Sequence, residues 1–379
     1  MARTFERATS TPFMEAMAAG NIAINGGMEV SQENGTTQIT LATGVSKYVV
    51  DMFSAVYGHA ANTAVIKAQQ VAPPGSPAFG LGFPSCLQIT STTALSSPAA
   101  GDFSFLRHFV EGYRTAKLGF GSAINPQYLT IGFWIYATIA GIATVSIRNN
   151  AQNRAYLANF TVNAPTTWEY KTITIPVDTT GTWLTTTGNG FELGFCFGTG
   201  ATLQGTNGVW QATNSVGTAA TTNFFASNSN TVCITGLGVW PGTDAPTQAR
   251  SPFAQRPFTE ELTLCQRYYE KSFEIATNPA QNVGSVLGAT YGAQIVGASL
   301  GAAMGSVKFA VRKRADPTIT LYNPSAANAQ IRNTSASSDW TATATASLGE
   351  VGFGIQGTTP AGSAAGQLAA VHWVADARL

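Results

Sequence analysis

Residues 129–183 consist of strand-like runs separated by turn-forming residues, and they carry little charge. Four such runs occupy residues 129–136, 145–150, 156–162 and 168–177, and a shorter one follows at 181–183. Each run is rich in β-branched and aromatic residues and is bounded by Gly, Asn, Pro or Asp, which predicts a strand between turns. Strands at this short spacing indicate an all-β sandwich or barrel rather than an α/β enzyme.

Charge is scarce along the whole chain of 379 residues, where 10% of residues are charged against about 25% in an average soluble domain. Thr, Ser, Asn, Gly and Ala take the place of charged side chains, which suits a β-rich particle component or an extracellular module. The net charge of +1 gives nucleic-acid binding no electrostatic support. We therefore expect no nucleic-acid partner.

Targeting and membrane signals are the next feature to consider. The first 17 residues carry Arg3, Glu6, Arg7 and Glu15, which does not fit a secretory signal peptide. No apolar run approaches the length of a membrane span, so we expect the protein not to be anchored in a bilayer.

The length allows two or three domains, and composition shifts divide the chain into four segments. Residues 1–24 form an N-terminal segment in which a helix begins near Thr11 and Pro12. Residues 25–257 hold the sandwich, with 103–113 predicted as a helical turn leading into a strand. Residues 258–283 form a helix and a linker, the helix spanning 259–272 with Thr259 as its N-cap.

Residues 284–379 are predicted to form a smaller C-terminal β domain. Its expected strands are 307–311, 318–322, 340–346, 351–355 and 369–375. The glycine-rich link at 281–305 is left open as a strand, a hinge or an arm.

The four cysteines lie far apart in the sequence, at Cys86, Cys196, Cys233 and Cys265. None forms a C-x-x-C pair and no His is nearby, so a metal site has little support. We expect buried thiols, with a Cys196–Cys233 bridge as the alternative left open.

Catalytic groups are few. Glu260 and Glu261 begin the predicted helix, where carboxylates complement the helix dipole. Asp102 and Glu111 flank an aromatic stretch, and an ion pair of Glu111 with Arg107 or Arg114 is a simpler role for that residue than catalysis. Three histidines occur without a nucleophile motif, so we expect no enzyme, no cofactor and no metal.

Tryptophans are the remaining candidates for a ligand-binding site, because a sugar ring stacks on an exposed aromatic face. Trp134 and Trp168 fit structural positions, the first in a run that is apolar on both faces. Trp183 and Trp210 are flanked by Thr, Gly, Asn and Gln and are the candidate ligand-binding residues. Packing in the core is the alternative for both.

Several strings along residues 22–273 resemble a jelly-roll module found in virion proteins of tailed bacteriophages. The string at 253–270, Phe-Ala-Gln-Arg-Pro-Phe-Thr-Glu-Glu-Leu-Thr-Leu-Cys-Gln-Arg-Tyr-Tyr-Glu, is the most specific of them. The others lie at 25–32, 111–113, 148–154, 167–176, 191–197, 206–211 and 234–236, with weaker echoes at 314–322 and 372–379. Where such modules continue from a Tyr to Asp-Arg-Trp, this chain has Tyr48 and then Asp51, Met52 and Phe53.

The resemblance implies an antiparallel jelly-roll sandwich similar to carbohydrate-binding modules, with a short linking helix and a smaller C-terminal β domain. It also implies a non-enzymatic tail fibre or spike subunit on the virion surface. Such a subunit forms a homotrimer, binds other virion proteins and contacts a host-surface glycan, with residues 1–24 docking it to the particle. The alternatives are a capsid decoration protein or head fibre, and a polysaccharide depolymerase.

Overall fold

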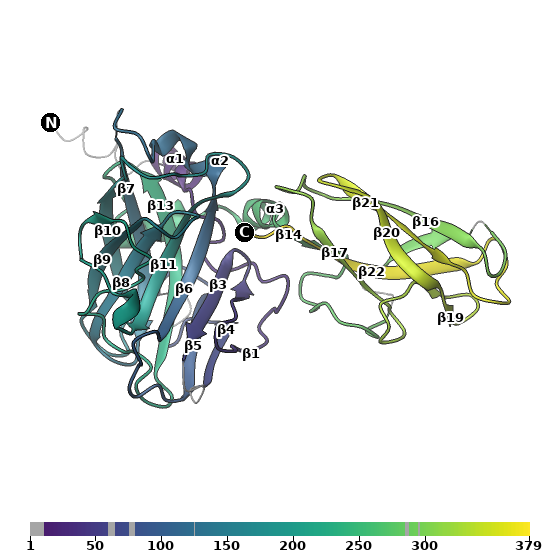
Figure 1. Cartoon of the computed structure of the whole chain (residues 1–379), viewed down its shortest axis with the longest axis horizontal. Coiled ribbons are helices and arrows are strands. Elements are labelled where there is room, and N and C mark those ends of the chain that lie inside the picture. Colours follow the sequence, from purple (N-terminus) through teal and green to yellow (C-terminus); the bar gives the residue numbers. More distant parts are fainter. Residues whose placement is uncertain (1–10, 60–64, 76–79, 125, 285–287, 295) are drawn as a thin grey trace. The chain divides into compact units, whose positions relative to one another are not determined.

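The computed structural model describes residues 11–59, 65–75, 80–124, 126–284, 288–294 and 296–379. Contacts divide the chain into two compact units. The jelly-roll unit comprises residues up to Ser31, Thr36–Glu261 and Leu379, and the C-terminal unit comprises Gln32–Gly35 and Leu262–Arg378. Each unit has its own sheets (Figure 1).

Eight strands of the jelly-roll unit make two antiparallel sheets. In chain order they are β5 (Cys86–Thr93), β6 (Phe103–Glu111), β7 (Tyr128–Ala137), β8 (Gly141–Arg148), β9 (Ala155–Val162), β10 (Glu169–Pro176), β11 (Asn189–Thr199) and β13 (Thr231–Pro241). Sheet A has the order β5-β13-β7-β10, and sheet B has the order β6-β11-β8-β9. Strands one, three, six and eight of the series thus share one sheet and the other four share the second, which is the strand order of a jelly roll. The predicted fold class is confirmed.

Further strands widen both sheets. Sheet A gains β4 (Val65–Val71) and β1 (Ile39–Thr40), and sheet B gains β3 (Phe53–Gly58), β2 (Lys47–Val50) and β12 (Trp210–Gln211). The helical segments are α1 (Thr11–Gly20), α2 (Gly112–Thr115), η2 (Ala116–Leu118), η3 (Ala201–Leu203), η4 (Gln248–Ala254) and α3 (Phe258–Gln266).

Aromatic side chains fill the space between the two sheets. Phe133 of β7 meets Phe195 of β11 edge to face at 4.9 Å and Phe160 of β9 at 5.1 Å. Such pairs add about 0.5–1.5 kcal/mol each beyond the area that they bury. The other face of β7 is buried too, because Trp134 lies under η4 and donates its indole N–H to Ser251 Oγ at 2.8 Å. This cover explains why the run at 129–136 is apolar on both faces.

The C-terminal unit is a second β structure. Its strands are β14 (Tyr269–Lys271), β15 (Thr290–Ala293), β16 (Gly301–Lys308), β17 (Thr318–Tyr322), β18 (Arg332–Asn333), β19 (Ser338–Asp339), β20 (Thr341–Gly349), β21 (Gly352–Thr358) and β22 (Leu368–Asp376). β22 pairs with β14, β15, β17 and β18, while β16, β21 and β20 form a separate sheet. Trp340, Phe353 and Trp373 belong to its buried core. Parts of the link at 281–305 are therefore strands.

Three local predictions are wrong. Residues 103–113 form strand β6 first and the short helix α2 after it, the reverse of the predicted order. The helix predicted over 259–272 ends at Gln266, because Tyr269–Lys271 pairs with β22 instead. Residues 181–183 lie outside the strands.

All four cysteines are buried free thiols. Cys196 lies on sheet B, whereas Cys233 lies on sheet A. Cys86 is also on sheet A, and a hydrogen bond with Cys233, together with burial, raises the pKa of its thiol. Burial raises the pKa of Cys196 to about 12. Thiols held protonated in this way are weak nucleophiles.

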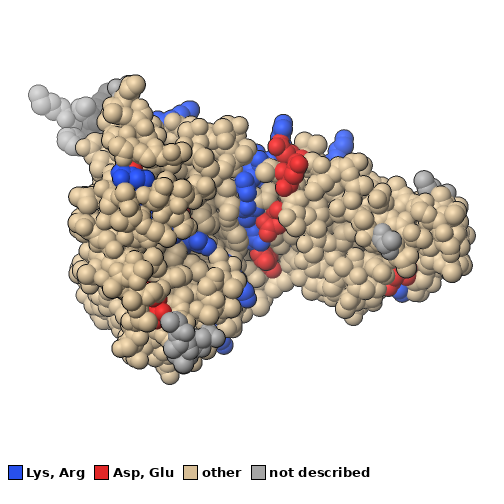
Figure 2. Space-filling view, viewed as in Figure 1, with Lys and Arg blue, Asp and Glu red and all other residues tan. Residues whose placement is uncertain are grey.

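Charged side chains are sparse on the surface as well. Over most of the face drawn in Figure 2 the atoms belong to neither acidic nor basic residues. Within the described residues, no helix has both the length and the apolar character needed to cross a membrane.

Candidate functional site

The two tryptophans predicted as a platform come together beside sheet B. Trp183 and Trp210 lie 5.4 Å apart, edge to face. Phe120 packs on Trp183 at 4.4 Å, and Tyr156 lies 5.3 Å from Trp210. Trp183 is only 8% exposed, whereas Trp210 is half-buried.

Both indole N–H groups of this cluster are already engaged by the backbone. Trp183 Nε1 donates to the Thr180 carbonyl at 3.0 Å, and Trp210 Nε1 donates to the Pro176 carbonyl at 2.8 Å. A ligand would therefore meet the remaining face of Trp210 rather than a polar edge. A platform role for this pair stays a prediction.

A pocket of about 320 Å³ lies on the outer face of sheet B, and we call it the sheet-B pocket. Its volume is at the low end for small-molecule sites, which span about 300–1,000 Å³. Strands β3, β6 and β8, the short helix η3 and three loops supply its lining. The lining residues are Gly44, Ser46, Val56, Phe103, Phe105, Arg107, Arg148, Gln152, Leu203, Asn214 and Val216.

Strand register explains why these side chains meet. On β6, Phe105 and Arg107 point to the same face because they are two residues apart. Arg107 is opposite Gly194 of β11, and Gly194 is opposite Ser146 of β8. A Cβ on Gly194 would lie 2.4 Å from Ser146 Oγ, so only glycine fits at this position. Without a side chain there, the middle of this face stays open.

A buried ion cluster underlies the sheet-B pocket. Arg148 donates to Glu192 Oε1 through Nε at 3.1 Å and also through Nη2. Arg107 Nη1 lies 3.7 Å from Glu192 Oε2, which is an ion pair without a hydrogen bond. The Arg148 and Glu192 side chains are 3% and 1% exposed. Arg148 Nη1 also donates to Asn214 at the rim.

Several polar atoms on this face lack hydrogen bonds. Arg107 Nε and Glu192 Oε2 make none, and neither do the Ser54 and Ser146 hydroxyls, although all four are buried. Ser54 is directly opposite Arg107 in the sheet. Buried polar groups usually find partners, so exceptions that gather at one place make this face the candidate site.

The sequence-based search missed this cluster. It gave Arg107 or Arg114 as the ion-pair partner of Glu111, whereas the structure pairs Arg107 with Glu192 of the neighbouring strand. The available signal was the alternation of Phe105, Arg107 and Phe109 in a chain with few charges. An arginine that alternates with aromatic residues on the outer face of a strand is a sequence signal for a candidate site on that face.

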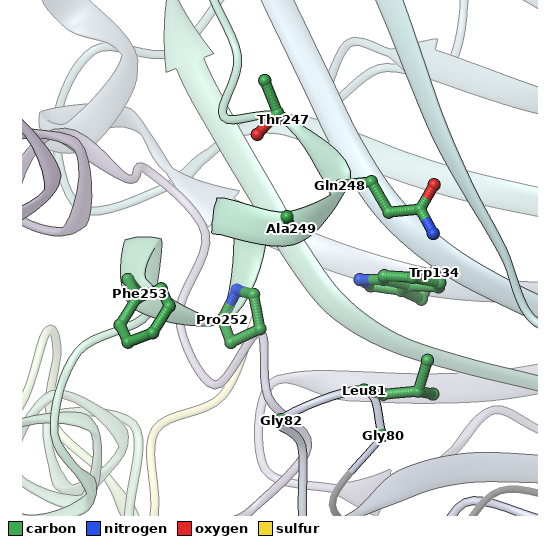
Figure 3. Close-up of a pocket in the computed structure, with 9 residues that line it drawn as sticks. All are labelled: Gly80, Leu81, Gly82, Trp134, Thr247, Gln248, Ala249, Pro252 and Phe253. Carbon is green, nitrogen blue, oxygen red and sulfur yellow. The ribbon is translucent and has the colours of Figure 1, made fainter. Parts of the chain in front are cut away.

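A larger cavity lies elsewhere in the jelly-roll unit and measures about 880 Å³ (Figure 3). Trp134 lies between Gln248 and Leu81 in that view, and Pro252 and Phe253 bound another side. Phe253 is 63% exposed. This Trp134 pocket has aromatic surface but no charged lining residue, since its other members are Gly80, Gly82, Thr247 and Ala249.

Asp102 and Glu111 are the carboxylates to compare with a glycosidase pair. Asp102 directly precedes β6 and Glu111 ends it, so about nine residues of strand separate them by roughly 30 Å. Glycosidase pairs are about 5–10 Å apart, which excludes this pair from such a role. Glu261 is instead buried, where it pairs with Arg256 and accepts the Asn25 N–H.

One hydroxyl–imidazole contact is present in the C-terminal unit. Ser272 Oγ is 3.0 Å from His372 Nδ1, and His372 Nε2 contacts the Gly284 carbonyl at 3.1 Å. Ser272 also accepts the Trp373 N–H, and Phe273 stacks on the imidazole at 4.1 Å. In a catalytic triad the second imidazole nitrogen is bonded to a carboxylate, whereas here it contacts the Gly284 carbonyl. The arrangement therefore fits a packing contact. In the described residues, no three His, Cys, Asp or Glu side chains are grouped as metal ligands.

No protein-family model and no curated protein sequence matches the chain. Among solved structures, the enzymatically active domain of bacteriophage CBA120 tailspike protein 4 is similar, with a TM-score of 0.29 and 10% identity over 59% of this chain and 22% of that one. A family 11 carbohydrate-binding module from Clostridium thermocellum has a TM-score of 0.26 and 11% identity over 55% and 98%. A family 61 module bound to β-1,4-galactotriose has a TM-score of 0.26 and 11% identity over 58% of this chain and 97% of that one.

The chain thus spans about a fifth of the tailspike domain and nearly all of the two modules. At these scores the fold assignment rests on the strand order. The chain is defined as an antiparallel jelly-roll protein with a second β unit.

Proposed function

We propose that the chain is a non-enzymatic virion protein of a tailed bacteriophage, a tail fibre or spike subunit whose jelly-roll unit binds a host-surface glycan. The observation that carries the proposal is the sheet-B pocket, where aromatic rings adjoin fixed polar groups. The sequence resemblance supplies the virion context. Jelly rolls serve both viral capsid and lectin domains, so the fold is compatible with either role without selecting one.

The pocket has the chemistry that a sugar requires. Phe103 offers apolar ring surface beside the buried Phe105, and Gln152 and Asn214 offer amides at the rim. Apolar surface with a few placed polar groups is the usual composition of a small-ligand site. A single sugar residue of a longer chain is the size of ligand that suits about 320 Å³.

We expect the full-length protein to bind at least one polysaccharide on an array of bacterial surface glycans. The double variant Gln152→Ala, Asn214→Ala will lower that affinity about tenfold, because two hydrogen bonds are lost. Gln248→Ala in the Trp134 pocket is the matched control and will bind like the parent protein. Binding to no glycan would refute the proposed function. Loss of binding in Gln248→Ala alone would move the site to the Trp134 pocket.

The virion assignment has its own test. An antibody against the chain is expected to label the tail of purified particles, with tens of copies or fewer, assembled as homotrimers. Label over the head with hundreds of copies would favour the capsid decoration protein or head fibre. Release of reducing sugar from the bound polysaccharide would instead favour a depolymerase.

Docking through residues 1–24 belongs to the same proposal. Residues 1–10 lie outside the described part of the chain, and 11–20 form α1. Asn21, Ile22, Ala23 and Ile24 are buried in the jelly-roll unit. Deleting the whole segment would therefore remove core residues, so a truncation that tests docking has to keep residues 21–24.

A further inference from the structure

The charges of the sheet-B pocket do not balance. Two arginines, Arg107 and Arg148, share one carboxylate, Glu192. The other groups that act electrostatically on Arg107 are Arg148, which is a second cation, and Tyr48, which is a phenol rather than a carboxylate. The cluster therefore retains one positive charge in a place where water reaches it poorly.

Arg107 holds that excess charge. Arg148 engages Glu192 closely, whereas Arg107 stays 3.7 Å from the carboxylate and its Nε makes no hydrogen bond. Its side chain is 14% exposed, more than either of the other two. Burial lowers the pKa of Arg107, which is the mark of a desolvated cation with incomplete compensation.

Aromatic rings hold this guanidinium in place. Its Cζ atom lies 5.0 Å from the Phe109 ring centre and 5.5 Å from that of Phe105. Contacts through the ring faces leave the N–H groups at the guanidinium edge for an acceptor. A carboxylate matches that edge, since Arg binds carboxylates through two parallel hydrogen bonds.

We propose that the glycan bound in the sheet-B pocket carries an acidic sugar whose carboxylate pairs with Arg107. This inference rests on the proposed function and names the ligand class of the same site. The carboxylate would supply the missing charge and accept the Arg107 Nε–H. A neutral sugar offers only a hydroxyl, which leaves the excess charge uncompensated.

The test compares the array polysaccharide that the full-length protein binds with its carboxyl-reduced form, which keeps the sugar rings and removes the charge. We expect affinity for the reduced form to be at least about tenfold weaker. Equal affinity for both forms, or a bound polysaccharide without any carboxylate, would overturn the inference and leave the proposed function intact. Because this comparison uses the parent protein, it does not depend on the folding of a variant.

A variant pair places the effect at Arg107. Arg107→Gln is expected to bind the acidic and the reduced polysaccharide equally weakly, and Arg107→Lys to retain part of the preference. Arg250→Gln, an exposed arginine outside the pocket, is the control and will discriminate like the parent. An Arg107→Gln protein that melts like the parent and still prefers the acidic form would exclude this residue as the carboxylate partner.

Discussion

Replacing Glu192 with glutamine will lower the free energy of unfolding of the jelly-roll unit by about 3–5 kcal/mol, the range for breaking a buried ion pair from one side. Glu192 is 1% exposed and is the carboxylate that both Arg148 and Arg107 face. Without its charge, two desolvated guanidinium groups remain close together with no counter-ion. Denaturant titration followed by tryptophan fluorescence will measure the loss.

The control for this prediction is Glu350→Gln, which removes a carboxylate from an exposed pair with Arg312 in the C-terminal unit. Exposed pairs contribute about 0–1 kcal/mol, so this variant will unfold almost like the parent. A double variant Glu192→Gln, Arg148→Met should recover part of the loss, because it removes one of the uncompensated cations. If Glu192→Gln is as stable as the parent, the cluster is not the buried ion network described here.

Local patterns predicted much of the fold. Runs of β-branched and aromatic residues between turn-forming residues located β7, β9 and β10 within a residue or two of their ends, and the predicted strand at 318–322 matches β17. Such a run depends only on the residues of one strand and its flanking turns, so a sequence carries it directly. The sandwich class followed, because strands with turns between them leave few other ways to bury their apolar faces.

The failures occurred where distant strands decide the structure. Tyr269–Lys271 continues a helical pattern in sequence, yet its pairing with β22, more than a hundred residues later, makes it a strand. The sheet-B pocket is a stronger case, since Arg148 and Glu192 are 44 residues apart and meet only because β8 and β11 are neighbours. Strand order is a property of the assembled sandwich, and no local pattern in one sequence encodes it.

Replacing Arg256 with methionine will destabilise the jelly-roll unit by a similar amount, about 3–5 kcal/mol at neutral pH. Arg256 donates to the Ala23 carbonyl at 3.0 Å, to Glu261 at 2.9 Å and also to the Asn21 carbonyl. It thereby fixes the chain that follows α1 to the sandwich. Losing it takes a donor from the buried Ala23 carbonyl and from the buried Glu261 carboxylate, while the Asn21 carbonyl keeps its hydrogen bond from Arg114. Arg250→Met, an exposed arginine of η4, is the matched control and should change stability by less than about 0.5 kcal/mol.

The loss in Arg256→Met will also depend on pH. Burial already raises the pKa of Glu261 against the opposing effect of Arg256, so removing Arg256 will raise that pKa further. A carboxyl whose pKa is higher in the folded state favours folding while it is protonated, and this benefit disappears as the pH rises through the folded-state pKa. The variant will therefore be closest to the parent in acid and will fall behind it as the pH increases toward neutrality. A stability difference that is constant from pH 4 to pH 8 would show that Arg256 acts through its hydrogen bonds to the backbone alone, and that Glu261 does not depend on it for its charge.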